Sequence, residues 1–395
     1  MDSFAPSDNR VLREALTAQL LGRVADSLDI TPTQFQRAKL AYETISEVVT
    51  SSADPRLAAA KVFPQGSFAI GTIVRPLNDA EGEFDVDLAC RLAANTSLTP
   101  TMAKGLVGAP LKADGRYADK LEEKTRCWCV NYTGEFHLDI CPLVRATATD
   151  AIPDKDLAMW ILTHPEEYAK WFNESADRAR TRLLKDSAVL KAEVAPFPEE
   201  NADKGWLRRI VQLLKRHRDT WCLRVGSRQA EFAPISIIIT TLAAMSFERE
   251  LRSGRQFTNP YNLIQRVMAG MPAFIEQRNI AGRVEWWIQS PVAAENFANR
   301  WNQDQRWVIA FREWHTVALA SVHELVSVTG LDGARPVLDS AFGASTATKA
   351  INSYSQQMRS ARDGGVLRFS PAAGGLTVSS AIAGTPITRH TFFGD

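Results

Sequence analysis

The sequence predicts an α+β protein built from two lobes. Its 395 residues, 45% of them hydrophobic, are enough for a large core and too many for one compact unit. Between residues 61 and 144, short segments alternate polar and apolar residues, as half-buried strands do. After residue 152, apolar residues recur at intervals of three and four, which indicates helices. We therefore expect a mixed first lobe and a mainly helical second lobe.

Changes in pattern along the chain suggest three parts. Residues 1–150 are expected to form the mixed lobe together with its N-terminal helices. Residues 151–360 are expected to form the helical lobe. From residue 361 onward the chain contains two Gly-Gly pairs and scattered Ser and Thr, a composition typical of loosely ordered segments. We expect residues 361–395 to be a flexible C-terminal tail.

The N-terminal region contains a clear helix start. Thr31 is a good N-cap, Pro32 fits the first helical position, and Gln34 completes a capping box. Apolar residues then recur at helical spacing as Phe35, Ala38, Tyr42, Ile45 and Val49. One face of this helix is therefore buried, and we expect the helix to brace the mixed lobe from outside.

The mixed lobe should contain four strands, and three helices can be located after it. The expected strands are 61–65, 83–90, 127–132 and 135–140, with the last two joined tightly around Thr133-Gly134. The expected helices begin near Pro165, Trp206 and Ile235.

Charge and hydropathy exclude several classes of protein. The chain has 46 basic and 45 acidic residues, whereas proteins that coat nucleic acid usually carry a basic excess. No apolar run approaches the roughly 20 residues that span a bilayer, and the N-terminus lacks the apolar region of a signal peptide. We expect a cytoplasmic protein with no membrane partner.

The five cysteines do not suggest a disulfide framework, because their number is odd and their spacing irregular. Cys127, Cys129 and Cys141 lie near His137, but the spacing differs from that of zinc sites. These cysteines fall in expected strands, where Cys packs as a small apolar residue. We expect reduced, structural thiols.

Three aspartates carry the strongest chemical signal. Asp85 and Asp87 alternate with apolar residues, so both project from one strand face, roughly 7 Å apart. Two like charges on one face destabilise the fold unless a cation lies between them. Asp139, in a later strand, can face the same side if the strands are neighbours. Three carboxylates can hold two Mg²⁺ (or Mn²⁺) ions about 4 Å apart, the arrangement that serves phosphoryl transfer.

Gln65, Gly66 and Ser67 supply a second part of the expected site. Gly66 lets the backbone approach a phosphate closely. Ser67 lies where a strand turns into a short helix, so its hydroxyl and the adjacent N–H groups can hold triphosphate oxygens. A Gly-Ser pair alone means little. Followed about twenty residues later by Asp-x-Asp, it becomes specific.

This order of motifs resembles the polymerase-β-like nucleotidyltransferase superfamily. Within it the chain is similar to the bacterial CD-NTases, the relatives of cGAS that make cyclic oligonucleotide signals in antiphage defence. The similarity spans roughly residues 30–350 and is clearest at 65–79, 84–88, 164–172 and 291–301. It implies a bilobed fold: a mixed-sheet palm with an N-terminal bracing helix, and a helical C-terminal lobe that closes the nucleotide pocket.

The resemblance also assigns nucleotide-binding roles in the helical lobe. Lys215 matches a lysine that binds triphosphate oxygens, and Ser236 matches a serine with the same role. Many relatives place a base-stacking aromatic residue after that serine, but Ile237 stands there in this chain. The sequence does not identify the stacking residue, for which Tyr132 or another aromatic residue is a candidate. No zinc insertion or basic DNA surface is visible, so activation by DNA is not expected.

The implied activity is the metal-dependent joining of nucleoside triphosphates, ATP among them, into a cyclic di- or trinucleotide with release of pyrophosphate. Two alternatives stay open: a nucleotidyltransferase acting on an RNA or protein acceptor, and a non-catalytic nucleotide-binding scaffold. The resemblance further implies partners among defence-operon regulators or machinery that conjugates the C-terminus, for which Phe392 to Asp395 would be the handle.

Overall fold

The computed structural model contains two compact units. The sheet unit comprises Asp29–Asn173 and Pro291–Ala293, and the helical unit comprises Met1–Leu28, Glu174–Ser290 and Ala294–Asp395. The residues that the structure describes are 6–77, 83–92, 98–146, 149–154, 156, 158–189, 204–257, 259–370, 375–378 and 384–387. Asn78, Asp79 and the segment from Phe392 to Asp395, which the sequence analysis singled out, lie outside them.

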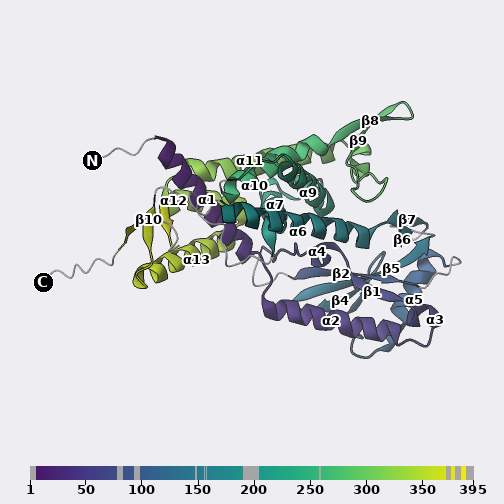
Figure 1. The fold of residues 1–395 in the computed structure, drawn as a ribbon. Helices are drawn as coiled ribbons and strands as arrows, with labels where there is room; N and C mark the ends of the chain where they lie inside the picture. The colour runs from purple at the N-terminus through teal and green to yellow at the C-terminus, as the bar shows by residue number, and fades with distance from the viewer. Residues whose placement is uncertain are drawn as a thin grey trace. The chain divides into compact units, whose positions relative to one another are not determined.

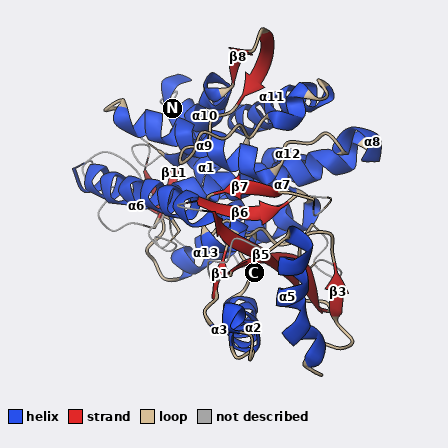
Figure 2. Ribbon diagram, turned by 90° about the vertical axis from the view of Figure 1, so that its right-hand side faces the viewer, coloured by secondary structure: helices blue, strands red, loops and turns tan. Residues whose placement is uncertain are grey.

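A mixed sheet forms the centre of the sheet unit. The described elements of this unit are α2 (Pro32–Thr50), α3 (Pro55–Ala58), β1 (Lys61–Pro64), α4 (Gly66–Ala69), β2 (Phe84–Arg91), α5 (Pro100–Ala113), β3 (Leu121–Glu123), β4 (Trp128–Tyr132), β5 (Phe136–Ala146), β6 (Thr149–Pro153), β7 (Trp160–Thr163) and the start of α6 (Pro165–Val189). The strand order is β1-β2-β5-β4-β3, and β6 joins β5 to β7. Figure 2 shows β5, β6 and β7 together. Only β2 and β5 pair in parallel among the described strands. The predicted α+β class is confirmed.

One face of this sheet is apolar and covered by two helices. Val86, Leu88, Leu138 and Ile140 are fully buried in the same cluster as the apolar sides of α2 and α5. Figure 1 shows α2 running along the sheet. Because side chains alternate along a strand, the residues between these apolar ones point to the opposite face. That face carries Asp85, Asp87 and Asp139.

Helix α2 begins as the sequence predicted. The Thr31 hydroxyl accepts a hydrogen bond from the Gln34 backbone N–H at 3.1 Å, and the Gln34 side chain accepts one from the Thr31 backbone N–H at 2.9 Å. Ala38, Ile45 and Val49 are buried on its inner side. The prediction of a capping box is confirmed, and the buried face is confirmed at these three residues. Phe35, which the spacing placed on that face, is exposed, because it lies in the first turn of the helix with its ring on Phe68.

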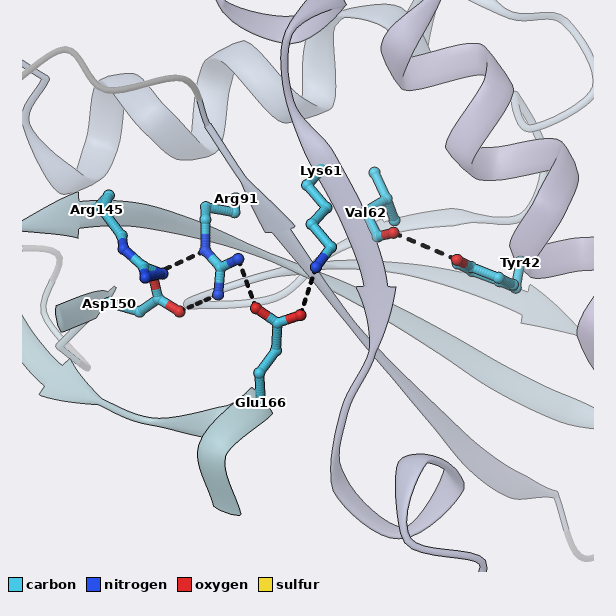
Figure 3. A network of polar contacts seen from close by, with 7 residues as sticks. All are labelled: Tyr42, Lys61, Val62, Arg91, Arg145, Asp150 and Glu166. Carbon is cyan, nitrogen blue, oxygen red and sulfur yellow. Dashed lines mark hydrogen bonds and ion pairs between the residues drawn. The ribbon is translucent and has the colours of Figure 1, made fainter. Parts of the chain in front are cut away.

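An ionic network joins five elements of the sheet unit (Figure 3). Arg91 of β2 donates to the buried Asp150 carboxylate of β6 at 2.8 Å and pairs with Glu166 of α6 at 2.6 Å. Lys61 of β1 reaches the same Glu166 at 2.5 Å, and Arg145 of β5 reaches Asp150 at 3.2 Å. The network therefore fastens the first turn of α6 and strand β6 to the sheet.

The helical unit is built from packed helices. Its further described elements are α1 (Pro6–Ser27), α7 (Gly205–Val225), α8 (Ser227–Ala230), α9 (Ser236–Arg252), α10 (Pro260–Gly270), η2 (Met271–Phe274), β8 (Glu276–Ile280), β9 (Arg283–Trp287), η3 (Asn299–Asn302), α11 (Arg306–Ser327), α12 (Gly330–Phe342), α13 (Ala344–Asp363), β10 (Arg368–Ser370), β11 (Gly375–Thr377) and β12 (Thr385–Pro386). Strands β8 and β9 form a hairpin that projects from the helices (Figure 1). No described helix is both long and apolar enough to cross a membrane.

Three features differ from the boundaries that the sequence predicted. Residues 151–173 lie in the sheet unit and not in the helical unit, because β6 pairs with β5 and β7 pairs with β6. The first 28 residues belong to the helical unit and not to the sheet unit. The reason is that Leu20, Leu21 and Val24 are fully buried where α1 packs on α13, α10, α11 and α7. The expected tail also contains regular structure, because β10 pairs with both β11 and β12.

Removing one charge from the network should destabilise the sheet unit. Asp150→Asn leaves the half-buried Arg91 guanidinium with a weaker partner, and removing one member of a buried ion pair costs several kcal/mol. We expect the free energy of unfolding in urea to fall by about 2 to 4 kcal/mol. The exposed Glu43, paired with Lys39 at 3.8 Å, is the matched control, and Glu43→Gln should change it by less than about 1 kcal/mol. Equal effects of the two changes would contradict the structural role of Asp150.

Candidate active site

The register of β2 and β5 brings the three aspartates together. Asp87 and Asp139 are direct partners across the parallel pair, and Asp85 lies opposite His137. Neighbouring strands are about 4.8 Å apart, so the carboxylates of Asp87 and Asp139 project side by side. Asp85 projects from the same face two residues earlier. The condition set by the sequence, that the two strands be neighbours, is met.

The turn between β1 and α4 lies directly against Asp87. The Gln65 N–H donates to the Asp87 carbonyl oxygen at 2.8 Å, which holds the turn to β2. Gly66 has a φ of +58°. A Cβ atom at Gly66 would lie 2.5 Å from Oδ2 of Asp87. Glycine is therefore required at this position for two reasons: the backbone has a positive φ, and there is no space for a side chain.

Ser67 follows in the single turn of α4. Its carbonyl oxygen accepts a hydrogen bond from the Thr72 N–H at 2.9 Å, which closes the loop after the helix. The ring of Phe68, the next residue, stacks on Phe35 of α2 at a centroid distance of 5.4 Å. The Gly66–Ser67 turn is thus held between β2 and α2, next to the aspartates.

The aspartates influence one another electrostatically. Asp85 is solvent-exposed, but the protein atoms around it displace part of its hydration, and this raises the pKa of its carboxyl group. The negative charge of Asp139 raises the same pKa further, while His137 and Lys124 oppose the rise. A cation at this face would relieve the repulsion between Asp85 and Asp139.

Lys124 is a member of this cluster that the sequence analysis did not find. Its ammonium group donates to both carboxylate oxygens of Asp139, at 3.0 and 3.2 Å. Burial lowers the pKa of Lys124, but the hydrogen bond and the attraction to Asp139 outweigh it, so the pKa is raised. The residue follows β3 in a turn, where no periodic pattern marks it.

Three thiols share this face of the sheet. Cys129 lies opposite Asp139, and the Cys127 sulfur is 3.5 Å from Oδ2 of Asp139. Burial raises the pKa of Cys129 and of Cys141 to about 12, and that of Cys127 is raised as well. All five cysteines are free. The thiols therefore stay protonated and add no negative charge beside the aspartates.

A second cluster of polar side chains fixes the start of β2 and the start of β5. His137 is held between Asn131 at Nδ1 and Glu83 at Nε2. Glu83 also accepts a hydrogen bond from the Gly134 N–H at 2.6 Å. The turn between β4 and β5 is thereby tied to the residue that precedes β2, which secures the strand register. The sequence analysis did not single out Glu83 or Asn131.

Tyr132 does not fit the stacking role considered from the sequence. It alternates with Val130 on the apolar face, and its ring stacks on Phe136 at a centroid distance of 4.5 Å. Its hydroxyl group and the aspartates are on opposite faces of the sheet, so this assignment is wrong.

The two nucleotide-binding candidates of the helical unit lie on packed helices. Lys215 is buried on α7, with 6% of its surface exposed, and is not a solvated lysine. Ser236 is the first residue of α9. Arg218 of α7 donates to the Pro234 carbonyl oxygen at 3.1 Å and to the Ser236 hydroxyl at 3.4 Å. This contact fixes the start of α9 against α7.

The donor set of the aspartate face suits a hard divalent cation. Carboxylate oxygens are the ligands that Mg²⁺ and Mn²⁺ prefer, and three of them project from one face here. Within the described part of the chain, no three His, Cys, Asp or Glu side chains are already gathered as a metal site. At Asp139 the Lys124 ammonium lies where a cation would bind.

Comparison with known proteins gives likenesses of three kinds: a family, a curated relative and solved structures. Residues 16–175 match the family described as the Second Messenger Oligonucleotide or Dinucleotide Synthetase domain. A curated c-di-GMP synthase of Roseivirga ehrenbergii is 27% identical over 393 residues, covering 95% of this chain and 96% of that protein. Among solved structures, Bradyrhizobium diazoefficiens CdnG in complex with GTP is similar, with a TM-score of 0.62 and 20% identity, over 84% of this chain and 97% of that one.

A second solved structure, E. coli MS115-1 CdnC with ATP, is similar with a TM-score of 0.59 and 15% identity, over 83% of this chain and 98% of that one. These two structures support the fold, and the curated relative and the family match extend the likeness to sequence. Together with the Gly66–Ser67 turn and the aspartates of β2 and β5, they support the resemblance seen in the sequence: the chain is similar to the bacterial CD-NTases, and its residues 16–175 match a second-messenger oligonucleotide or dinucleotide synthetase domain.

Proposed function

We propose that this enzyme joins nucleoside triphosphates into a cyclic oligonucleotide second messenger. In each step a ribose hydroxyl of one nucleotide forms a bond to the α-phosphorus of another. The bond from that phosphorus to the β-phosphate bridging oxygen breaks, and pyrophosphate leaves. The observation that carries the proposal is the pairing of Asp87 with Asp139 beside the Gly66 turn.

Each residue is proposed for a defined task. Asp85, Asp87 and Asp139 would hold divalent cations, with Asp139 on the side of the attacking hydroxyl. Two bound Mg²⁺ or Mn²⁺ ions would neutralise the negative charge of the phosphates. Gln65, Gly66 and Ser67 would orient the triphosphate, the turn by its backbone N–H groups and Ser67 by its hydroxyl. Catalysis then consists mainly of positioning and charge stabilisation.

Lys215 and Ser236 are proposed to bind triphosphate oxygens from the helical unit. Their support is the family resemblance and the fixed placement of both side chains on α7 and α9. Arg218, which contacts the Ser236 hydroxyl, would hold that hydroxyl in place.

The substrates and role are inferred from the relatives. The curated relative is named for c-di-GMP, and the similar structures hold GTP and ATP. We propose purine nucleoside triphosphates as substrates and antiphage signalling as the role of the product. CdnC is also known in complex with a HORMA protein, and a regulator of that kind is a proposed partner.

The test is incubation of the purified protein with all four α-³²P-labelled nucleoside triphosphates and Mg²⁺ or Mn²⁺, followed by phosphatase, chromatography and mass spectrometry. A phosphatase-resistant cyclic product is expected. Asp85→Asn and Asp139→Asn should each lower its rate on the order of 100-fold or more, because each removes a charge placed for phosphoryl transfer. Asp114→Asn makes the same change at a carboxylate that pairs only locally with Arg116, and should leave the rate unchanged. Synthesis at the wild-type rate by the Asp85 and Asp139 variants would defeat the proposal.

Gly66→Ala should impair synthesis without unfolding the protein. An added Cβ is strained at this φ and must displace the Asp87 carboxylate. We expect a loss of rate of roughly 10- to 100-fold, since small misplacements at a reacting centre are costly. Gly254→Ala is the control, because φ is +74° there and nothing lies within 4 Å of the new Cβ. Equal rates for the two variants would show that contact with Asp87 is unimportant.

A further inference from the structure

The side chain of Lys124 is aimed at Asp139 by the backbone around it. Its N–H donates to the Cys127 carbonyl oxygen at 3.1 Å, which continues the pairing of β3 with β4. The preceding residue, Glu123, is held by Lys104 at 2.9 Å. The turn that carries Lys124 is thus fixed on both sides, and its ammonium contacts both oxygens of Asp139.

The charges near Asp139 explain why a cation is favoured at this position. Asp85, Asp87 and Asp139 place three carboxylates on one face of β2 and β5. Arg91, further along the same face, is committed to Asp150 and Glu166. Among the contacts described for Asp139, Lys124 supplies the positive charge.

A divalent ion that binds Asp139 competes with this ammonium group, because Lys124 contacts both carboxylate oxygens and two cations at one carboxylate repel each other. The displacement is feasible. About a third of the Lys124 side chain is exposed (37%), and lysine has a flexible four-carbon stem whose ammonium is readily hydrated. The ammonium group can therefore withdraw into solvent.

We propose that Lys124 is an internal counter-cation of Asp139, which a divalent ion displaces on binding, so that Lys124 sets the ion concentration at which the Asp139 side of the site is loaded. The inference rests on the proposed function in taking Asp139 as a metal ligand. In the nucleotide-free enzyme Lys124 keeps that carboxylate neutralised. A bound triphosphate would add negative charge and so strengthen the binding of the ion further.

The test measures Mn²⁺ binding to the full chain without nucleotide, from the loss of the free Mn²⁺ signal in electron paramagnetic resonance. Lys124→Met removes the competing charge and should tighten Mn²⁺ binding by roughly three- to tenfold. Lys124→Arg should weaken it, because a guanidinium group pairs with a carboxylate through two parallel hydrogen bonds. Lys39→Met, which breaks the exposed pair with Glu43, makes the same change in net charge elsewhere and should have no effect.

Unchanged or weaker Mn²⁺ binding by a folded Lys124→Met variant overturns the inference. So does a gain in affinity that survives in the double variant Lys124→Met with Asp139→Asn, because the gain must arise at Asp139. If the wild-type protein forms a cyclic product while Lys124→Met binds Mn²⁺ as the wild type does, only this inference fails. If the wild type neither binds Mn²⁺ nor forms a product, the proposed function fails and the inference fails with it.

Discussion

The parallel pairing of β2 with β5 decides which side chains meet in this protein. It sets Asp87 beside Asp139 on one face, and it sets Val86 and Leu88 beside Leu138 and Ile140 on the other. The apolar face is buried under α2 and α5. A slip of one residue would therefore bury the carboxylates and expose the core, so burial of one face enforces the arrangement of the other. Stability and chemistry depend on the same register.

The charged side chains on the sheet form two groups with different effects. The buried Asp150 carboxylate pairs with Arg91 and Arg145, and Arg91 also pairs with Glu166. These ion pairs fasten β6 and α6. Around Asp139, the Lys124 ammonium contacts the carboxylate, and Asp85 and Asp87 project from the same face of the sheet. The first group links strands and a helix and has a structural effect. The second gathers three carboxylates on one face, which is the donor set that a site for divalent ions requires.

Local patterns predicted much of the fold and the aspartate cluster, and distant contacts account for what they missed. Thr31 and Gln34 predicted the start of α2 because a capping box needs only four residues. The segment of α1 is helical, but its partner α13 lies more than 300 residues away, so its place in the helical unit could not be read locally. Lys124 lies in a turn without periodicity, and its role depends on the pairing of three strands. Tyr132 differs, since its alternation with Val130 already placed it on the apolar face.

The protonated thiols beside Asp139 have a practical consequence. Thiolates, not thiols, react with alkylating reagents, so burial and a raised pKa make Cys129 and Cys141 slow to label in the folded protein. They lie on β4 and β5, at the centre of the strand pairing. Their labelling therefore requires a local opening that exposes this face of the sheet. The rate at which these two thiols react thus reports on opening of the central sheet without an engineered cysteine.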